Sequence, residues 1–198
     1  MEIIKHDSNP PAFIYDLTGH APDEADRRRR LDLLAIAAQA ERMGDRATAE
    51  DARLKADLLL KPVWNDEVRN LVTTAGKNDL GTKYFAGSAY TAAWYLLLLN
   101  ASGSIAATDT LAAHAGWAEA TPYSGTRPAI AFGTFANGSS TASPVNIAIT
   151  GAATITGAGI CSAASGSSGI LYSASNFAGP RTMQAGDSLT VIPTVSFS

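Results

Sequence analysis

Charge is distributed very unevenly along this chain, and the distribution restricts the folds open to it. Residues 1–85 contain 28 of the 33 Lys, Arg, Asp and Glu side chains, whereas residues 86–198 contain five. Such a change in composition is typical of a boundary between parts of different architecture. We therefore expect a boundary near Gly87, between a charged N-terminal part and a charge-poor C-terminal part.

The charge-poor part has the pattern of an antiparallel β-structure. Short alternating segments such as VNIAIT (145–150) and SLTVIPTVSFS (188–198) are separated by turn signals such as NGSS and SGSSG. This pattern predicts a β-sandwich of the jelly-roll type over residues 86–198. The side chains expected in its core are Trp94, Leu96, Leu98, Ile147, Ile149, Leu189 and Val191.

The most apolar run of the chain, AAWYLLLLN (92–100), fits a strand better than a membrane segment. A membrane-spanning helix requires about 20 residues, and this run is much shorter. The first residues also lack the basic start and apolar core of a signal peptide. We expect a buried strand here and no membrane partner.

Residues 1–22 are predicted to form an extended N-terminal arm. Pro10, Pro11, Gly19 and Pro22 exclude a continuous helix. The arm carries too many apolar side chains for a fully solvated tail, so we expect it to lie on a neighbouring subunit. The candidate contact residues in the arm are Ile3, Ile4, Phe13, Ile14 and Tyr15.

Residues 23–85 are predicted to be a helical region, which makes the chain an α+β protein. Asp23 can cap a first helix, Gly44 can end it, and Asp45 can cap a second helix that continues to Pro62. Thr73 can cap a third helix. The first two helices should form a hairpin.

The motifs of enzymes and of cofactor sites do not occur in this sequence. There is no nucleophile elbow, phosphate loop or dinucleotide fingerprint. His6, His20 and His114 lack the spacing of metal ligands. Cys161 is the single cysteine, which excludes an intramolecular disulfide and fits a reducing cytoplasm. We expect no catalysis, no cofactor and no metal.

One basic run, Arg27 to Arg30, raises the question of nucleic-acid binding. Four arginines could neutralise several phosphates. However, Asp23, Glu24, Asp26 and Asp32 surround the run, and consecutive helical residues point in different directions. The sequence favours a solvated or subunit-contact role for Arg27, Arg28, Arg29 and Arg30, and no specific nucleic-acid partner.

Three segments together resemble a family of small structural proteins of tailed bacteriophages. They are VTTAGKNDLGTKYFAGSAYTAAWYLLLLN, DTLAAHAGWAEATPYSGTRPAIAFGT and SSGILYSASNFAGPRTMQAGDSLTVIPTVSFS. They follow the order of the family pattern, in which a GLNDLLTKYF helix precedes a TAAWYVGLV strand and a PR–GDTLNV segment closes the chain. The resemblance covers residues 72–198. Gly81 replaces a leucine of the pattern, and PAIAF lacks its tryptophan.

This resemblance implies a virion component without catalysis, and specifically a head decoration, or cement, protein. Its partners would be the major capsid protein and copies of itself in a homo-oligomer such as a trimer, and its location the surface of the phage head after synthesis in the host bacterial cytoplasm. Two alternatives stay open. One is a tail, neck or fibre adaptor, and the other is a carbohydrate-binding module that uses exposed Trp117, Tyr123 or Tyr172.

Overall fold

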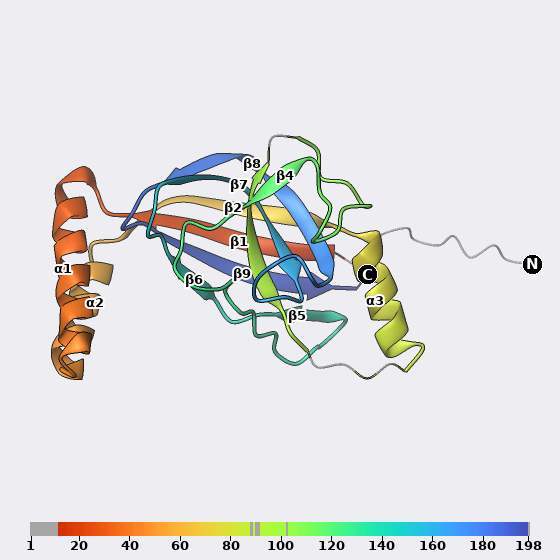
Figure 1. The fold of residues 1–198 in the computed structure, drawn as a ribbon, viewed down its shortest axis with the longest axis horizontal. Coiled ribbons are helices and arrows are strands. Elements are labelled where there is room, and N and C mark those ends of the chain that lie inside the picture. Colours follow the sequence, from red (N-terminus) through yellow and green to blue (C-terminus); the bar gives the residue numbers. More distant parts are fainter. Residues whose placement is uncertain (1–11, 88, 90–91, 102, 198) are drawn as a thin grey trace, which may run out of the picture.

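Two long strands, one before and one after a pair of helices in the sequence, form the centre of the fold (Figure 1). The computed structural model describes residues 12–87, 89, 92–101 and 103–197. Its helices are α1 (Glu24–Arg42), α2 (Arg46–Asp57) and α3 (Thr74–Tyr84). Its strands are β1 (Ala12–Ala21), β2 (Lys61–Val72), β3 (Tyr95–Ala101), β4 (Trp117–Ala120), β5 (Ser139–Thr141), β6 (Val145–Ala148), β7 (Ala153–Cys161), β8 (Leu171–Met183) and β9 (Ser188–Ser196).

The described strands join in one curled sheet with antiparallel pairing throughout. The order is β4-β3-β7-β8-β2-β1-β9-β5, and β6 also pairs with β9. β1 pairs along almost its whole length with β2 and β9, whereas the ladder between β2 and β8 contains only the pairs Leu71–Ala174 and Val72–Ser173. The sheet therefore consists of two well-paired groups of strands with a short connection between them.

The main core lies inside this curl and combines residues from both groups of strands. β1 contributes Tyr15 and Leu17, and β3 contributes Leu96 and Leu98. The other predicted core residues, Ile147, Ile149, Leu189 and Val191, are buried in the same cluster, and Trp94 packs against it. A second cluster on the other face of β3 contains Leu97, Leu99 and Trp117. The apolar run of β3 is thus buried on both faces, as continuous apolar strands usually are.

The ends of the helices confirm the expected capping residues. The carboxylates of Asp23 and Asp45 accept hydrogen bonds from the backbone N–H groups of Asp26 and Thr48. Gly44, with φ +76°, lies in the turn between α1 and α2, where a glycine has little steric penalty. Among the described residues, no helix has the length and apolar character needed to cross a membrane.

α3 also begins at its expected cap, because Thr73 accepts a hydrogen bond from the N–H of Gly76. Gly76 allows α3 to approach β8 closely. A Cβ at this position would lie 2.7 Å from the backbone Cα of Tyr172. The glycine that weakens this helix in isolation is therefore required for its packing.

The predicted boundary near Gly87 does not divide the molecule. β1 and β2 come from the charged part of the chain, yet they lie in the middle of the sheet. β2 is a strand within the region expected to be helical. Its charged residues obscured the alternation of buried Val68, Asn70 and Val72 with exposed Glu67 and Arg69. The expectation of a sandwich formed by residues 86–198 alone was therefore wrong.

The expectation of an extended arm over residues 1–22 can be compared with the structure at residues 12–21, since residues 1–11 lie outside the described residues; there the backbone is extended, but it belongs to the sheet. Residues 12–21 are extended because they form β1, which begins directly after Pro11 and ends before Pro22. Proline commonly lies at the ends of strands, since it cannot donate to the ladder. The pattern that suggested a free arm was that of a strand bounded by prolines.

Candidate functional site

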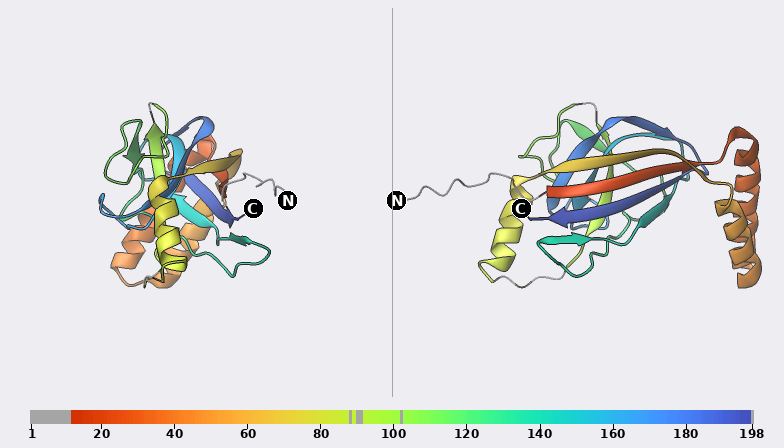
Figure 2. Two further views of the ribbon diagram at one scale, coloured as in Figure 1. Left: turned by 90° about the vertical axis from the view of Figure 1, so that its right-hand side faces the viewer. Right: turned by 180° about the vertical axis from the view of Figure 1, so that it is seen from behind.

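The two helices α1 and α2, with the turn between them, form a helical hairpin (residues 24–57) at one end of the long strands. α3 lies at the opposite end (Figures 1 and 2). The hairpin is inserted between β1 and β2, so these paired strands carry it away from the core. Its position makes it the most separate element of the described chain.

Small side chains hold the two helices of the hairpin together. The buried residues at their contact are alanines: Ala37, Ala40, Ala49, Ala52 and Ala56. Leu33 and Leu34 are half-buried, but five other large apolar side chains face solvent, contrary to the usual pattern of an amphipathic helix. The exposed ones are Leu31, Ile36, Met43, Leu54 and Leu58, with Met43 and Leu58 about three-quarters exposed (76% and 75%). Ile36 directly precedes the buried Ala37 and is itself exposed.

Ion pairs attach the hairpin to the strands. Arg27 Nη1 donates to Asp187 Oδ1 at 2.7 Å, and Asp187 is buried. Lys61 Nζ at the start of β2 donates to Asp23 Oδ2 at 2.7 Å. Asp187 also accepts from the N–H of Gln184, which orders the turn before β9. The hairpin is thus fixed to the body through the turn before β9 and the start of β2.

The four consecutive arginines separate into two pairs, as their positions on a helix require. Arg27 and Arg30, three residues apart, face the body of the protein, whereas Arg28 and Arg29 are exposed. Of the four candidate contact arginines, Arg28 and Arg29 are thus available to a partner. Arg27 and Arg30 are part of the attachment of the hairpin.

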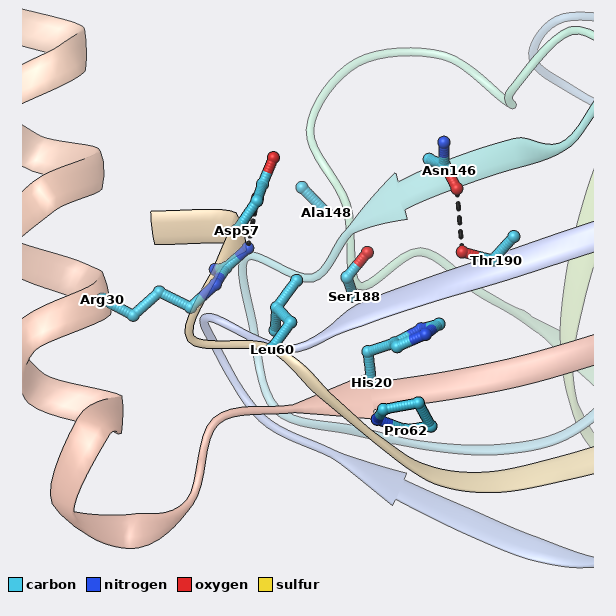
Figure 3. A pocket seen from close by; sticks show the side chains of 9 residues that line it. All are labelled: His20, Arg30, Asp57, Leu60, Pro62, Asn146, Ala148, Ser188 and Thr190. Atoms are coloured by element: carbon cyan, nitrogen blue, oxygen red, sulfur yellow. Dashed lines mark hydrogen bonds and ion pairs between the residues drawn. The ribbon is translucent and has the colours of Figure 1, made fainter. Parts of the chain in front are cut away.

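A cavity of about 550 Å³ lies where the hairpin meets the outer face of the sheet (Figure 3). Arg30 and Asp57 line it from the hairpin side, and His20, Asn146, Ser188 and Thr190 line it from the strands. Arg30 is 3% exposed, and its Nη2 donates to Asp57 Oδ1 at 3.3 Å. Burial lowers the pKa of the Arg30 guanidinium, because water no longer stabilises its charge.

A second polar cluster surrounds Arg127. Its Nε and Nη2 donate to the two oxygens of Glu119 at 2.8 and 2.7 Å, and Nη1 donates to the carbonyl of Ala163 at 2.8 Å. Nη2 also donates to the carbonyl of Gly166 at 2.7 Å. Arg127 therefore connects Glu119 of β4 to the loop after β7. The hydrogen bonds from Arg127 to Glu119 are the largest cause of the raised pKa of Arg127.

Tyr123 lies beside this cluster with a covered hydroxyl that has no hydrogen-bond partner among the described residues. Burial raises its pKa to about 12, above the ordinary value of about 10. The neutral form is therefore favoured in the folded state. Its contribution to stability is complete below about pH 10 and is lost as the pH rises through about 12.

We expect the substitution Tyr123→Phe to reduce the loss of stability at alkaline pH. Phenylalanine keeps the ring and removes the titrating hydroxyl, so stability at neutral pH should change by less than about 1 kcal/mol. Urea unfolding at pH 8 and at pH 11 measures both effects. Identical alkaline losses in the variant and the parent protein would contradict the assignment.

The candidate contact residues of the expected arm have different outcomes. Ile3 and Ile4 lie outside the described residues. Phe13 and Ile14 lie in β1. Tyr15 is fully buried, and its hydroxyl is 2.9 Å from Ser173 Oγ, so it is a core residue and not a capsid contact. Deleting residues 1–22 would remove β1, which lies in the middle of the sheet.

The aromatic residues considered for carbohydrate binding do not form an exposed platform. Trp117 and Tyr172 are each 5% exposed, and Tyr123 is partly buried. The Trp117 ring stacks on His114 and donates through Nε1 to Asp109 at 3.0 Å. The interpretation of these residues as exposed sugar-stacking side chains was therefore wrong.

Comparison of the chain with protein-family models, with curated proteins and with solved structures found no match. Within the described ranges, no group of three or more His, Cys, Asp and Glu side chains has an arrangement that could hold a metal ion. Cys161 is buried, and burial raises the pKa of its thiol. The exposed hairpin and the cavity beneath it are the features from which a function can be argued.

Proposed function

We propose that this chain is a non-enzymatic structural component of a tailed-phage virion, and specifically a decoration protein of the phage head. Its helical hairpin would attach to the assembled capsid, and copies of the chain would associate into an oligomer. The observation that carries the attachment role is the exposure of five large apolar side chains on a hairpin whose two helices meet through alanines. Exposed apolar surface of this kind is typical of protein contacts.

The ordered resemblance over residues 72–198 supports the virion assignment. The charge-poor composition of that region also supports it, because neutral β-surfaces can pack against neighbours with little desolvation cost. An oligomer would combine several modest contacts, since linked sites bind with a high effective concentration.

We also propose that the curled sheet is a variant of the jelly-roll sandwich. The two groups of strands enclose the main core, and the strand ladder that joins them is the short β2–β8 pairing. In this interpretation the two groups correspond to the two layers of a sandwich. A solved homologue with two separate sheets would support the relationship, and one with a closed barrel would contradict it.

Immunolabelling of virions with an antibody against this chain tests the location. Label spread over the head supports decoration, whereas label at a single vertex supports a neck or tail component. The copy number per particle provides an independent measure, because a decoration protein occurs in many copies and a vertex component in about twelve or fewer.

We expect the double substitution Leu54→Gln and Leu58→Gln to weaken capsid binding by at least tenfold, or about 1.4 kcal/mol. Leu54 is exposed on α2 and Leu58 is exposed at its C-cap, and burial of one leucine contributes roughly 1.5–3 kcal/mol. Glutamine has a helix propensity close to that of leucine, so the hairpin should stay folded. Co-sedimentation with capsids that lack the protein measures the affinity.

The matched control is Phe85→Gln, which changes an apolar side chain that is 94% exposed just after α3, at the other end of the molecule. Loss of binding in this control and not in the hairpin variant would assign attachment to the opposite end. Loss of binding on Arg28→Gln with Arg29→Gln, together with a steep salt dependence, would assign it to the exposed arginines.

A further inference from the structure

The floor of the cavity at the hairpin is built by the register of three strands. His20 of β1 pairs with Ser188 of β9, which also pairs with Ala148 of β6. β9 alternates between buried and half-buried residues, which places Ser188 and Thr190 together on the outer face. Three neighbouring strands therefore present polar side chains to one hollow beneath the helices (Figure 3).

The hydrogen bonding of this floor leaves several donors available to a ligand. Thr190 Oγ1 donates to Asn146 Oδ1 at 2.8 Å, so the amide of Asn146 has its NH₂ group available as a donor. The hydroxyl of Ser188 and the imidazole of His20 can also donate a hydrogen bond. A surface of this composition suits a ligand rich in acceptor oxygens.

Arg30 brings an incompletely paired positive charge to the wall of the cavity. Its Nε and Nη1 are covered and have no hydrogen-bond partner within the described part of the chain. Its ion pair with Asp57 is a single 3.3 Å contact, and the Asp57 side chain is 66% exposed. An ion pair with so exposed a partner contributes little, so a second anion can replace Asp57 at small cost.

We propose that this cavity binds a small oxyanion, a carboxylate or a phosphate group, with Arg30 as its charge partner. The guanidinium turns from Asp57 toward the bound oxygens, and Ser188 and Asn146 donate to the remaining ones. Arginine suits this role because its planar group can donate two parallel hydrogen bonds to one carboxylate or phosphate. The volume of about 550 Å³ is within the usual range of small-molecule sites.

Titration with sodium phosphate and, separately, with sodium acetate at constant ionic strength tests the proposal. Amide chemical shifts in 15N NMR spectra report the site, and we expect saturable changes at residues 20, 30, 146, 188 and 190. Saturation by phosphate alone, or by acetate alone, identifies the class of oxyanion. Changes that are linear and spread over the surface with both salts would overturn the proposal.

Three substitutions separate binding from structural effects. Arg30→Met should weaken binding at least tenfold, Ser188→Ala should weaken it about threefold, and Asp57→Asn should tighten it severalfold by removing the competing carboxylate. Arg28→Met, on the exposed side of the same helix, is the matched control and should leave binding unchanged. Should Arg30→Met not fold, Asp57→Asn decides, because unchanged or weaker binding in that variant would contradict the competition with Asp57.

Discussion

Replacing Arg127 with methionine is expected to lower the free energy of unfolding by about 3–5 kcal/mol. The side chain is 6% exposed and makes four hydrogen bonds, two to Glu119 and two to backbone carbonyls. Methionine has a similar length but no donor, so Glu119 and both carbonyls would lose a charged partner. Urea unfolding at pH 7 measures the loss.

The substitution Arg53→Met is the matched control. Arg53 and Glu41 form an ion pair at 2.6 Å, shorter than the Arg127 contacts, but both side chains are about half exposed. Exposed pairs contribute about 0–1 kcal/mol, so this variant should unfold almost as the parent protein does. A loss below about 1 kcal/mol for Arg127→Met would contradict the structural role of the buried pair.

The five charged residues after residue 85 mark structural contacts, which the sequence analysis did not infer from them. All five charged side chains there have a partner. Asp109 accepts from Trp117, Glu119 pairs with Arg127, and the last two form ion pairs with the N-terminal part, Arg181 with Asp66 and Asp187 with Arg27. In a charge-poor region, each remaining charge has a specific structural contact. The sequence could identify these residues but not their partners, which are up to 160 positions away.

Local features were predictable because they depend on neighbouring residues. The caps at Asp23, Asp45 and Thr73 and the turn at Gly44 all lie where short-range patterns placed them. β1 and β2 were missed as parts of the sheet because their pairing is long-range. Proline boundaries and alternating charges are compatible with an arm or a helix until a partner strand is known.

The cavity at the hairpin could not have been predicted from sequence spacing. Its polar residues come from α1, α2, β1, β6 and β9, and they meet only because the strand register aligns Ser188 with both His20 and Ala148. The arginine run was the one sequence signal near this site, and helical geometry then separated its inward members from its exposed ones.

The substitution Leu98→Ala is expected to lower the free energy of unfolding by about 2–5 kcal/mol, the range for a leucine deleted from a packed core. Leu98 is fully buried in the main cluster, between strands that pair on both sides. The same change at Leu54, which is 63% exposed on α2, should alter stability by less than about 0.5 kcal/mol, since alanine is also the better helix former. Thermal and urea unfolding of the two variants provide the comparison.

The contrast between these two leucines tests the proposal that the core stabilises the fold and the hairpin contacts a partner. Leu98 should matter for folding, and Leu54 should matter only when a partner covers the hairpin. A Leu54→Ala variant that stays stable but binds capsids less well would assign Leu54 to the contact surface, whereas loss of stability in Leu98→Ala would assign Leu98 to the core. A large loss of stability in Leu54→Ala would instead mean that the outer face of α2 is already packed within the chain. That result would contradict the proposal that the hairpin attaches to a partner.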